Sequence, residues 1–204
     1  NQCSKTLETH FINSGHIESQ TVEVDSSSYK YIWENAGTIK TTRTQLAGRQ
    51  LNFINMPTGS LTTSVLTSTA SNLDNQGTIK VKDTMSVSEF TNSQGSTLKT
   101  DSLVLHKDGK FTNALKSLVK VKKDLQAEKG TFHNHGEMLT KGIFFQESGD
   151  FTNTGTWFHD GDVDTGDTFL RNNSGSVVWR NGKWQFKPRE HWNQGQLLLE
   201  NMTC

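Results

Sequence analysis

The sequence predicts an all-β protein, a parallel β-helix of about ten coils that each contain about 20 residues. Two observations predict this fold class. A pattern of an aromatic residue, an asparagine and a glycine returns at a steady spacing between residues 11 and 199. Hydrophobic residues make up only 31% of the 204 residues, below the roughly 45–50% that is typical of globular domains. A thin core that repeats along an axis accounts for both observations.

The repeat reads aromatic-x-Asn-x-Gly-x-aliphatic, and residues 11–17 and 33–39 are intact copies. One copy has Ser117 where the glycine is expected, and another has Arg171 at the aromatic position, with Leu170 beside it. The average step between the glycines is about 20 residues. Ten asparagines belong to the repeat: Asn13, Asn35, Asn55, Asn75, Asn92, Asn113, Asn134, Asn153, Asn173 and Asn193.

Each copy predicts two or three short strands. The Phe-x-Asn alternation is typical of a strand with both side chains on one face. Asn-x-Gly is typical of a turn, because glycine adopts backbone conformations that other residues avoid. Alternation resumes after the glycine, as in residues 79–81, and a third strand-like segment follows in several copies, as in residues 103–105. A unit of this size cannot bury its own apolar face, so the copies must stack.

Stacking places asparagine over asparagine, with one rung every ~4.8 Å. An inward column of asparagines would form hydrogen bonds along the axis and so satisfy polar groups inside the core. We therefore expect the repeat asparagines to form a structural ladder. Ten rungs would span about 43 Å.

Two other architectures give regular strand spacing, the β-propeller and the β-sandwich. A propeller blade needs about 40 residues, twice this period, and a sandwich does not require the same asparagine and glycine in every copy. We expect a single β-helix domain over residues 1–204, with an aromatic-rich cap or binding end at residues 157–204.

Composition argues against several classes of partner. The 21 basic and 21 acidic residues balance, which argues against nucleic acid. An apolar run of about 18 residues is lacking, which argues against membrane insertion. The two cysteines, Cys3 and Cys204, lie at opposite ends, so we expect neither a disulfide framework nor a zinc site. The chain begins with Asn1 and not with Met, and we expect a processed product or an internal segment.

The Phe-x-Asn-x-Gly-x-Ile unit resembles the repeats of filamentous haemagglutinin-like exoproteins over about residues 11–199. These are two-partner-secreted adhesins, haemolysins and contact-dependent inhibition toxins of Gram-negative bacteria. The resemblance implies a secreted or cell-surface rod, exported through an outer-membrane Omp85-type transporter. It also implies cell adhesion and virulence, through a receptor protein or glycan on a host or neighbouring cell. The family's Asn-Pro-Asn-Gly-type secretion motif is absent, so the chain is similar to an internal part of the rod.

Aromatic residues gather in the last quarter of the chain. Aromatic rings stack on sugars and anchor protein partners, so we expect ligand-binding roles for Trp157, Trp179, Trp184 and Trp192. Asn181-Gly182 between two strand-like stretches is typical of a hairpin, which would interrupt the coils there. The alternative is that the rings fill a wide coil or cap the end of the solenoid.

Two charged stretches could bind ligands. Asp160, Asp162 and Asp164 alternate in an acidic run, and alternate aspartates can converge on a calcium ion. We expect no other cofactor, and a solvated loop is the alternative. The lysine-rich stretch at residues 116–129 is either a solvated strand face or a patch for an anionic glycan.

Enzymes such as polysaccharide lyases and hydrolases also use β-helices, but they need clustered carboxylates. Outside residues 160–167 the sequence shows no such cluster. We expect a non-enzymatic rod and adhesion segment. The alternatives are the receptor-recognition region of a contact-dependent growth inhibition toxin and a carbohydrate-active β-helix enzyme.

Overall fold

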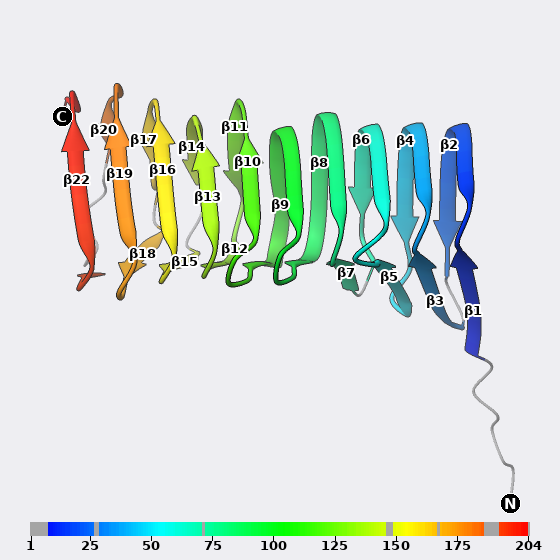
Figure 1. Ribbon diagram of the computed structural model, residues 1–204. Helices are drawn as coiled ribbons and strands as arrows, with labels where there is room; N and C mark the ends of the chain where they lie inside the picture. Colours follow the sequence, from blue (N-terminus) through cyan, green and yellow to red (C-terminus); the bar gives the residue numbers. More distant parts are fainter. Residues whose placement is uncertain are drawn as a thin grey trace, which may run out of the picture.

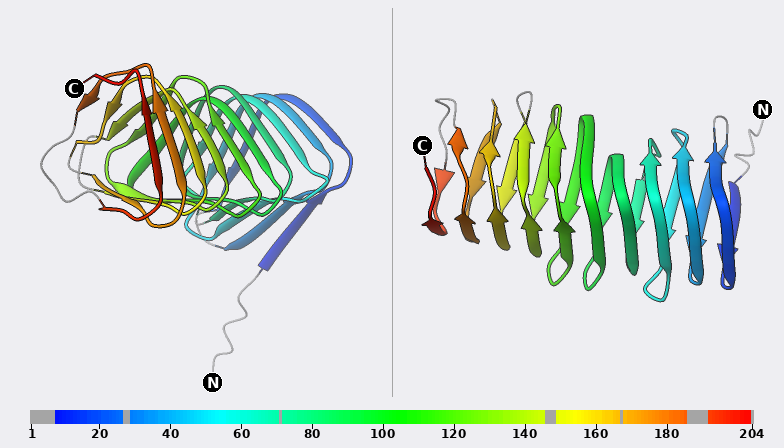
Figure 2. Two further views of the ribbon diagram at one scale, coloured as in Figure 1. Left: turned by 60° about the vertical axis from the view of Figure 1, so that its left-hand side comes forward. Right: turned by 90° about the horizontal axis from the view of Figure 1, so that it is seen from above.

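The computed structural model describes residues 8–26, 29–70, 72–145, 149–166, 168–185 and 192–203. Within these ranges the chain is all β and forms a parallel β-solenoid of about nine turns, which confirms the predicted fold class (Figure 1). The first and last coils lie at opposite ends of one stack (Figure 2). No helix that could span a membrane occurs among the described residues. Cys3 and Cys204 lie outside them.

A complete coil has three strand segments on three faces. The first face, here called the asparagine face, carries the Phe-x-Asn segments. It contains β1 (Glu8–Asn13), β3 (Lys30–Asn35), β5 (Leu51–Asn55), β7 (Asn72–Asn75), the ends of β8 (Thr78–Asn92) and β9 (Thr97–Asn113), β12 (Gly130–Asn134), β15 (Asp150–Asn153), β18 (Phe169–Asn172) and β21 (Trp192–Asn193).

The second face, called the central face, follows the glycine. It contains the first parts of β2 (His16–Asp25), β4 (Thr38–Ala47), β6 (Ser60–Ser68), β8 (Thr78–Asn92) and β9 (Thr97–Asn113), then β10 (Leu118–Val121), β13 (Glu137–Thr140), β16 (Thr156–Asp160), β19 (Ser176–Arg180) and β22 (Gln196–Glu200). The third face contains the later parts of the five long strands, then β11 (Asp124–Ala127), β14 (Gly142–Phe145), β17 (Val163–Asp164) and β20 (Trp184–Gln185).

Equivalent strands of successive coils pair in parallel, so like residues stack on like. On the asparagine face, Phe90 pairs with Phe111 and Phe111 with Phe132. Their ring centroids lie 5.1 and 5.2 Å apart. Such aromatic pairs stabilise a core beyond their buried area. The core is therefore one continuous narrow column of apolar side chains.

The asparagines form a hydrogen-bonded ladder that is buried from Asn13 to Asn172 and exposed at Asn193. Each Nδ2 donates to the Oδ1 of the next rung at 2.7–2.9 Å. The members are Asn13, Asn35, Asn55, Asn75, Asn92, Asn113, Asn134, Asn153, Asn172 and Asn193. The ladder thus provides hydrogen-bond partners for the amide groups of the buried asparagines.

One ladder position corrects the sequence prediction, because Asn172 occupies the rung that was assigned to Asn173. Asn172 pairs with Asn153 and is buried, whereas Asn173 is exposed. The turn to Gly175 holds one more residue than the Asn-x-Gly turns do. The spacing between the inward apolar residue and the ladder asparagine is therefore preserved, because Leu170 pairs with Phe151.

The turn after the ladder needs glycine where rungs lie directly against each other. A Cβ on Gly155 would overlap the carbonyl oxygen of Gly136. Two coils replace this glycine with Ser96 and Ser117, and their turns are longer. Ser117 Oγ donates to the ladder oxygen Oδ1 of Asn113 at 2.6 Å.

These longer turns shift two residues from their expected roles. Gly95 is not in the glycine column, since it adopts a positive φ of 78° within the turn, where Lys116 has 62° in the next coil. Val119, and not Leu118, is the buried aliphatic residue of its copy.

Candidate functional site

Two of the four tryptophans expected to bind ligand are core residues. Trp157 is 2% exposed and Trp179 is 4% exposed. Trp157 stacks on Phe151 with a centroid distance of 4.4 Å and meets Trp179 edge to face at 5.3 Å. These two rings fill the last coils and do not form an exposed surface, although together with Trp192 they line a cavity of about 260 Å³. Their ligand-binding role stays a prediction.

The other two tryptophans differ. Trp192 is 54% exposed on the asparagine face. Trp184 lies in β20, and its side chain is outside the described set. The predicted hairpin at Asn181-Gly182 is wrong, because the strands on either side, β19 and β20, pair in parallel with β16 and β17. The coils therefore continue through this region.

The three aspartates of the acidic run each have a separate contact. Asp160 Oδ1 accepts from Asn181 Nδ2 at 2.9 Å, and this hydrogen bond lowers the pKa of Asp160. Asp162 and Asp164 accept from backbone amides, those of Lys183 at 2.8 Å and Gly166 at 3.0 Å. The described residues contain no group of three or more His, Cys, Asp or Glu side chains that could hold a metal. The structure therefore does not bring the three predicted calcium ligands together.

A buried polar cluster lies beside them in the core. His159 Nδ1 lies 2.8 Å from Thr140 Oγ1, which also accepts from Trp157 Nε1 at 2.9 Å. His159 Nε2 lies 3.0 Å from the carbonyl oxygen of Asp162. Burial lowers the pKa of His159 to about 4. This histidine is 1% exposed, so it serves the packing of the core and not a surface reaction.

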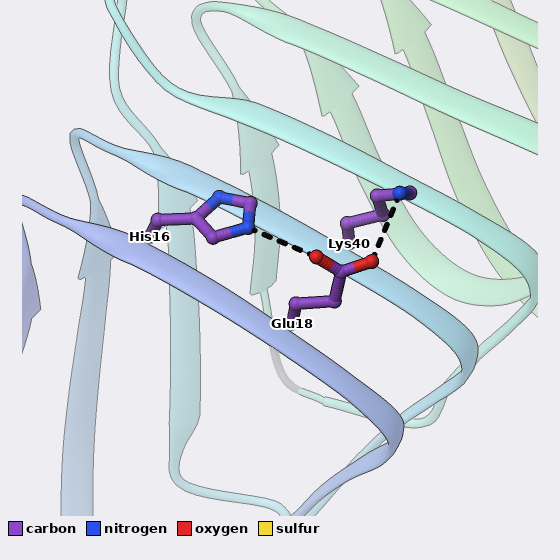
Figure 3. A network of polar contacts seen from close by, with 3 residues as sticks. All are labelled: His16, Glu18 and Lys40. Carbon is purple, nitrogen blue, oxygen red and sulfur yellow. Dashed lines mark hydrogen bonds and ion pairs between the residues drawn. The ribbon is translucent and has the colours of Figure 1, made fainter.

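The most distinctive surface feature is a row of outward side chains along the central face. Each member lies three residues after the glycine-column residue of its coil. The row starts with Glu18, which accepts a hydrogen bond from Lys40 in the next coil at 2.9 Å and contacts His16 at 3.4 Å (Figure 3). The full row, here called the outward row, is Glu18, Lys40, Thr62, Lys80, Lys99, Lys120, Leu139, Phe158, Val178 and Leu198.

The outward row changes character along its length. Lys80, Lys99 and Lys120 are exposed on three successive rungs, and none forms an ion pair with a described residue. The next four members are apolar. Phe158 is 42% exposed and Leu198 is 50% exposed, while Leu139 and Val178 are half-buried.

The apolar members lie in a shallow groove of about 940 Å³. Charged side chains border it: Lys122 bonds to Asp101 at 2.9 Å, and Arg180 lies 3.9 Å from Asp160. Contiguous exposed apolar surface with a polar border is typical of interaction sites. We therefore take this groove as the candidate functional site.

Sequence reasoning missed the groove although a signal was present. The residue three positions after each glycine must point outward, because side chains alternate along a strand. Reading that position through the copies would have found the change from lysine to apolar side chains. Reading the positions two and four after the glycine would have placed Trp157 and Trp179 inside.

Comparison with known proteins adds no relative to this picture. No protein-family model, no curated protein and no solved structure matches the chain.

Proposed function

We propose that the protein is a non-enzymatic rod segment of a secreted bacterial surface exoprotein that adheres to a host or neighbouring cell through the groove on its central face. The proposal rests mainly on the outward row, where Leu139, Phe158, Val178 and Leu198 lie next to one another on the outside of the solenoid. Burying such a patch against a receptor would gain about 25 cal/mol per Å² of apolar surface.

The row of lysines beside the patch suits a receptor with anionic groups, either a protein or a glycan. Lys99 and Lys120 occupy adjacent rungs, so their ammonium groups repel each other when unliganded. An anionic ligand would relieve that repulsion. The location at a bacterial cell surface is proposed from the resemblance of the repeat to exoprotein rods.

Binding of the purified chain to a glycan array and to fixed epithelial and Gram-negative cells tests the proposal. We expect binding that Phe158→Ser and Leu139→Ser weaken at least about tenfold, which corresponds to roughly 1.4 kcal/mol. Leu115→Ser is the matched control, because Leu115 is 60% exposed but lies outside the groove.

Equal binding by all three variants would reject the groove as the site. Cleavage of a bound polysaccharide would instead favour the carbohydrate-active enzyme.

A further inference from the structure

We propose that the groove on the central face binds an amphipathic α-helix of a protein receptor, with the helix lying along the axis of the solenoid. The proposal rests on the proposed function and names the class of partner that the groove accepts. Three properties of the groove support a helix: the spacing of its apolar side chains, the distance between its borders and the charges beside it.

A partner has to bind this face through side chains. β16 pairs with β13 on one side and with β19 on the other, and β19 also pairs with β22. The backbone groups of β16 and β19 are therefore already used in the sheet. Binding by addition of a strand needs a free sheet edge, so it does not occur along these strands.

The apolar side chains of the groove repeat at nearly the spacing of an apolar stripe on a helix. Leu139, Phe158, Val178 and Leu198 occupy successive rungs, so they span three steps of ~4.8 Å, or about 14 Å. A helix with apolar residues at i, i+3, i+7 and i+10 covers about 15 Å with the same number of contacts, at 1.5 Å per residue.

An extended chain laid along the same row does not match it. Alternate side chains of a strand lie about 6.6 Å apart, so its contacts would span about 20 Å and lose register with the rungs. Amphipathic helices bind grooves through apolar anchors at i, i+3, i+4 and i+7. The row of apolar side chains therefore favours a helix over an extended peptide.

The borders of the groove are far enough apart for a helix. One border consists of the residues two positions after the apolar members: Lys141, Asp160 and Arg180. The other consists of the residues two positions before them: Glu137, Thr156 and Ser176. Four residues of strand separate the borders, which is about 13 Å at ~3.3 Å per residue. A helix with its side chains is about 10–12 Å across and fits between them.

Two lysines at one end of the groove favour an acidic helix. Lys120 and Lys141 are exposed, and neither forms an ion pair with a described residue. Acidic residues along one edge of the helix would supply the missing partners, and a basic residue on the opposite edge would face Glu137. The other basic residues of the lining already contact carboxylates: Lys122, Lys123 and Arg180.

Fluorescence anisotropy with two labelled peptides of equal composition tests the inference. The first peptide has leucines at i, i+3, i+7 and i+10 and glutamates along one edge of that stripe. An i, i+4 lactam on its outer side holds the helix, because short helices are marginal in water. The second peptide has the same lactam and the same residues, but its leucines are distributed around the helix. We expect the first peptide to bind at least about tenfold more tightly.

Substitutions in the chain locate the bound peptide. Phe158→Ser should weaken binding of the first peptide at least about tenfold. Leu115→Ser, at an exposed position outside the groove, should leave it unchanged. Circular dichroism checks that each variant keeps its fold.

Reversal of charge tests the acidic edge of the helix. Lys141→Glu should weaken binding of the first peptide at least about threefold. A peptide with lysines in place of its glutamates should bind Lys141→Glu more tightly than it binds the unmodified chain. Lys110→Glu, at an exposed position on the asparagine face, is the matched control and should change neither affinity.

Equal binding of the two peptides, or no binding of the first, would overturn the inference. Unchanged binding of the first peptide to Phe158→Ser, or a charge-reversed peptide that prefers the unmodified chain, would also overturn it. Adhesion to cells or glycans through the groove without binding of the first peptide would reject the helix and leave the proposed function standing. Peptide binding without adhesion would reject the proposed function and leave the preference of the groove for a helix standing.

Discussion

Asn75 Nδ2 donates to Oδ1 of Asn92 at 2.8 Å, and both side chains are completely buried. Asn75 also accepts from Asn55 at 2.8 Å and donates to the carbonyl oxygen of Thr97 at 3.0 Å. One side chain thus holds three successive rungs together. This arrangement explains how a chain with few hydrophobic residues can bury polar side chains in its core.

We expect Asn75→Ala to lower the free energy of unfolding by about 1–3 kcal/mol. The substitution leaves the Thr97 carbonyl without its side-chain donor and removes one link from the ladder, and unsatisfied buried polar groups carry a cost of this size. Urea unfolding followed by circular dichroism measures the change.

Asn181→Gly is the control for the ladder prediction. Asn181 makes exposed hydrogen bonds to Asp160 and Asn201, at 2.9 and 3.3 Å. Its φ of 58° suits glycine better than alanine, so this change removes the amide without adding backbone strain. A loss as large as that of Asn75→Ala would argue against the buried ladder as a source of stability.

The repeat was enough to predict the solenoid, because units of about 20 residues cannot bury their own apolar face and must stack on their neighbours. It did not settle the register where two signals conflicted. Asn173 keeps the spacing to Gly175, whereas Asn172 keeps the spacing to Leu170. In the structure Leu170 pairs with Phe151, which places Asn172 and not Asn173 in the ladder. A turn can accommodate an extra residue more easily than a packed strand can.

The candidate site was harder to predict for a different reason. Tryptophan content indicates recognition only where the rings are exposed, and content does not distinguish the two faces of a strand. Trp157 and Phe158 are neighbours in the chain, yet the first is buried and the second is in the groove. The position of a residue within its copy, and not the tryptophan content, indicates whether its side chain is buried or exposed.

Gly155→Ala should destabilise the protein by about 1–3 kcal/mol, the usual cost of overpacking. Its new Cβ would overlap the carbonyl oxygen of Gly136 in the rung below. Gly15→Ala is the matched control, because a Cβ on Gly15 meets nothing within 4 Å. Thermal unfolding of both variants measures the difference, and similar melting temperatures would show that the rungs can separate at this turn.

Stability should fall as the pH decreases from about 6.5 to about 4, because burial lowers the pKa of His159 over that range. Between these values the unfolded chain takes up a proton at His159 that the folded chain refuses, so stability is complete above the unfolded pKa. The effect approaches about 3 kcal/mol, at 1.36 kcal/mol per pKa unit. Urea midpoints measured across the range test it.

His159→Gln should flatten this part of the pH profile, since glutamine does not titrate. The pKa values of the carboxylates of Glu18 and Asp101 are also lowered in the folded chain. Their contribution to the stability of the fold is therefore lost as the pH falls further. An unchanged slope in His159→Gln would assign the acid sensitivity to other groups.

Trp157→Ala and Phe158→Ala should have opposite consequences although the two residues are adjacent. Trp157 is 2% exposed and loses its stacking on Phe151 and its hydrogen bond to Thr140, so we expect a cost of about 3–5 kcal/mol. Phe158 is 42% exposed, and its removal should cost less than about 1 kcal/mol while weakening adhesion. Melting temperatures and cell binding of the folded fraction, measured on the same samples, separate the two roles. If Trp157→Ala melts normally and loses binding, the core assignment of that ring is wrong and recognition has to be sought at the aromatic end of the chain.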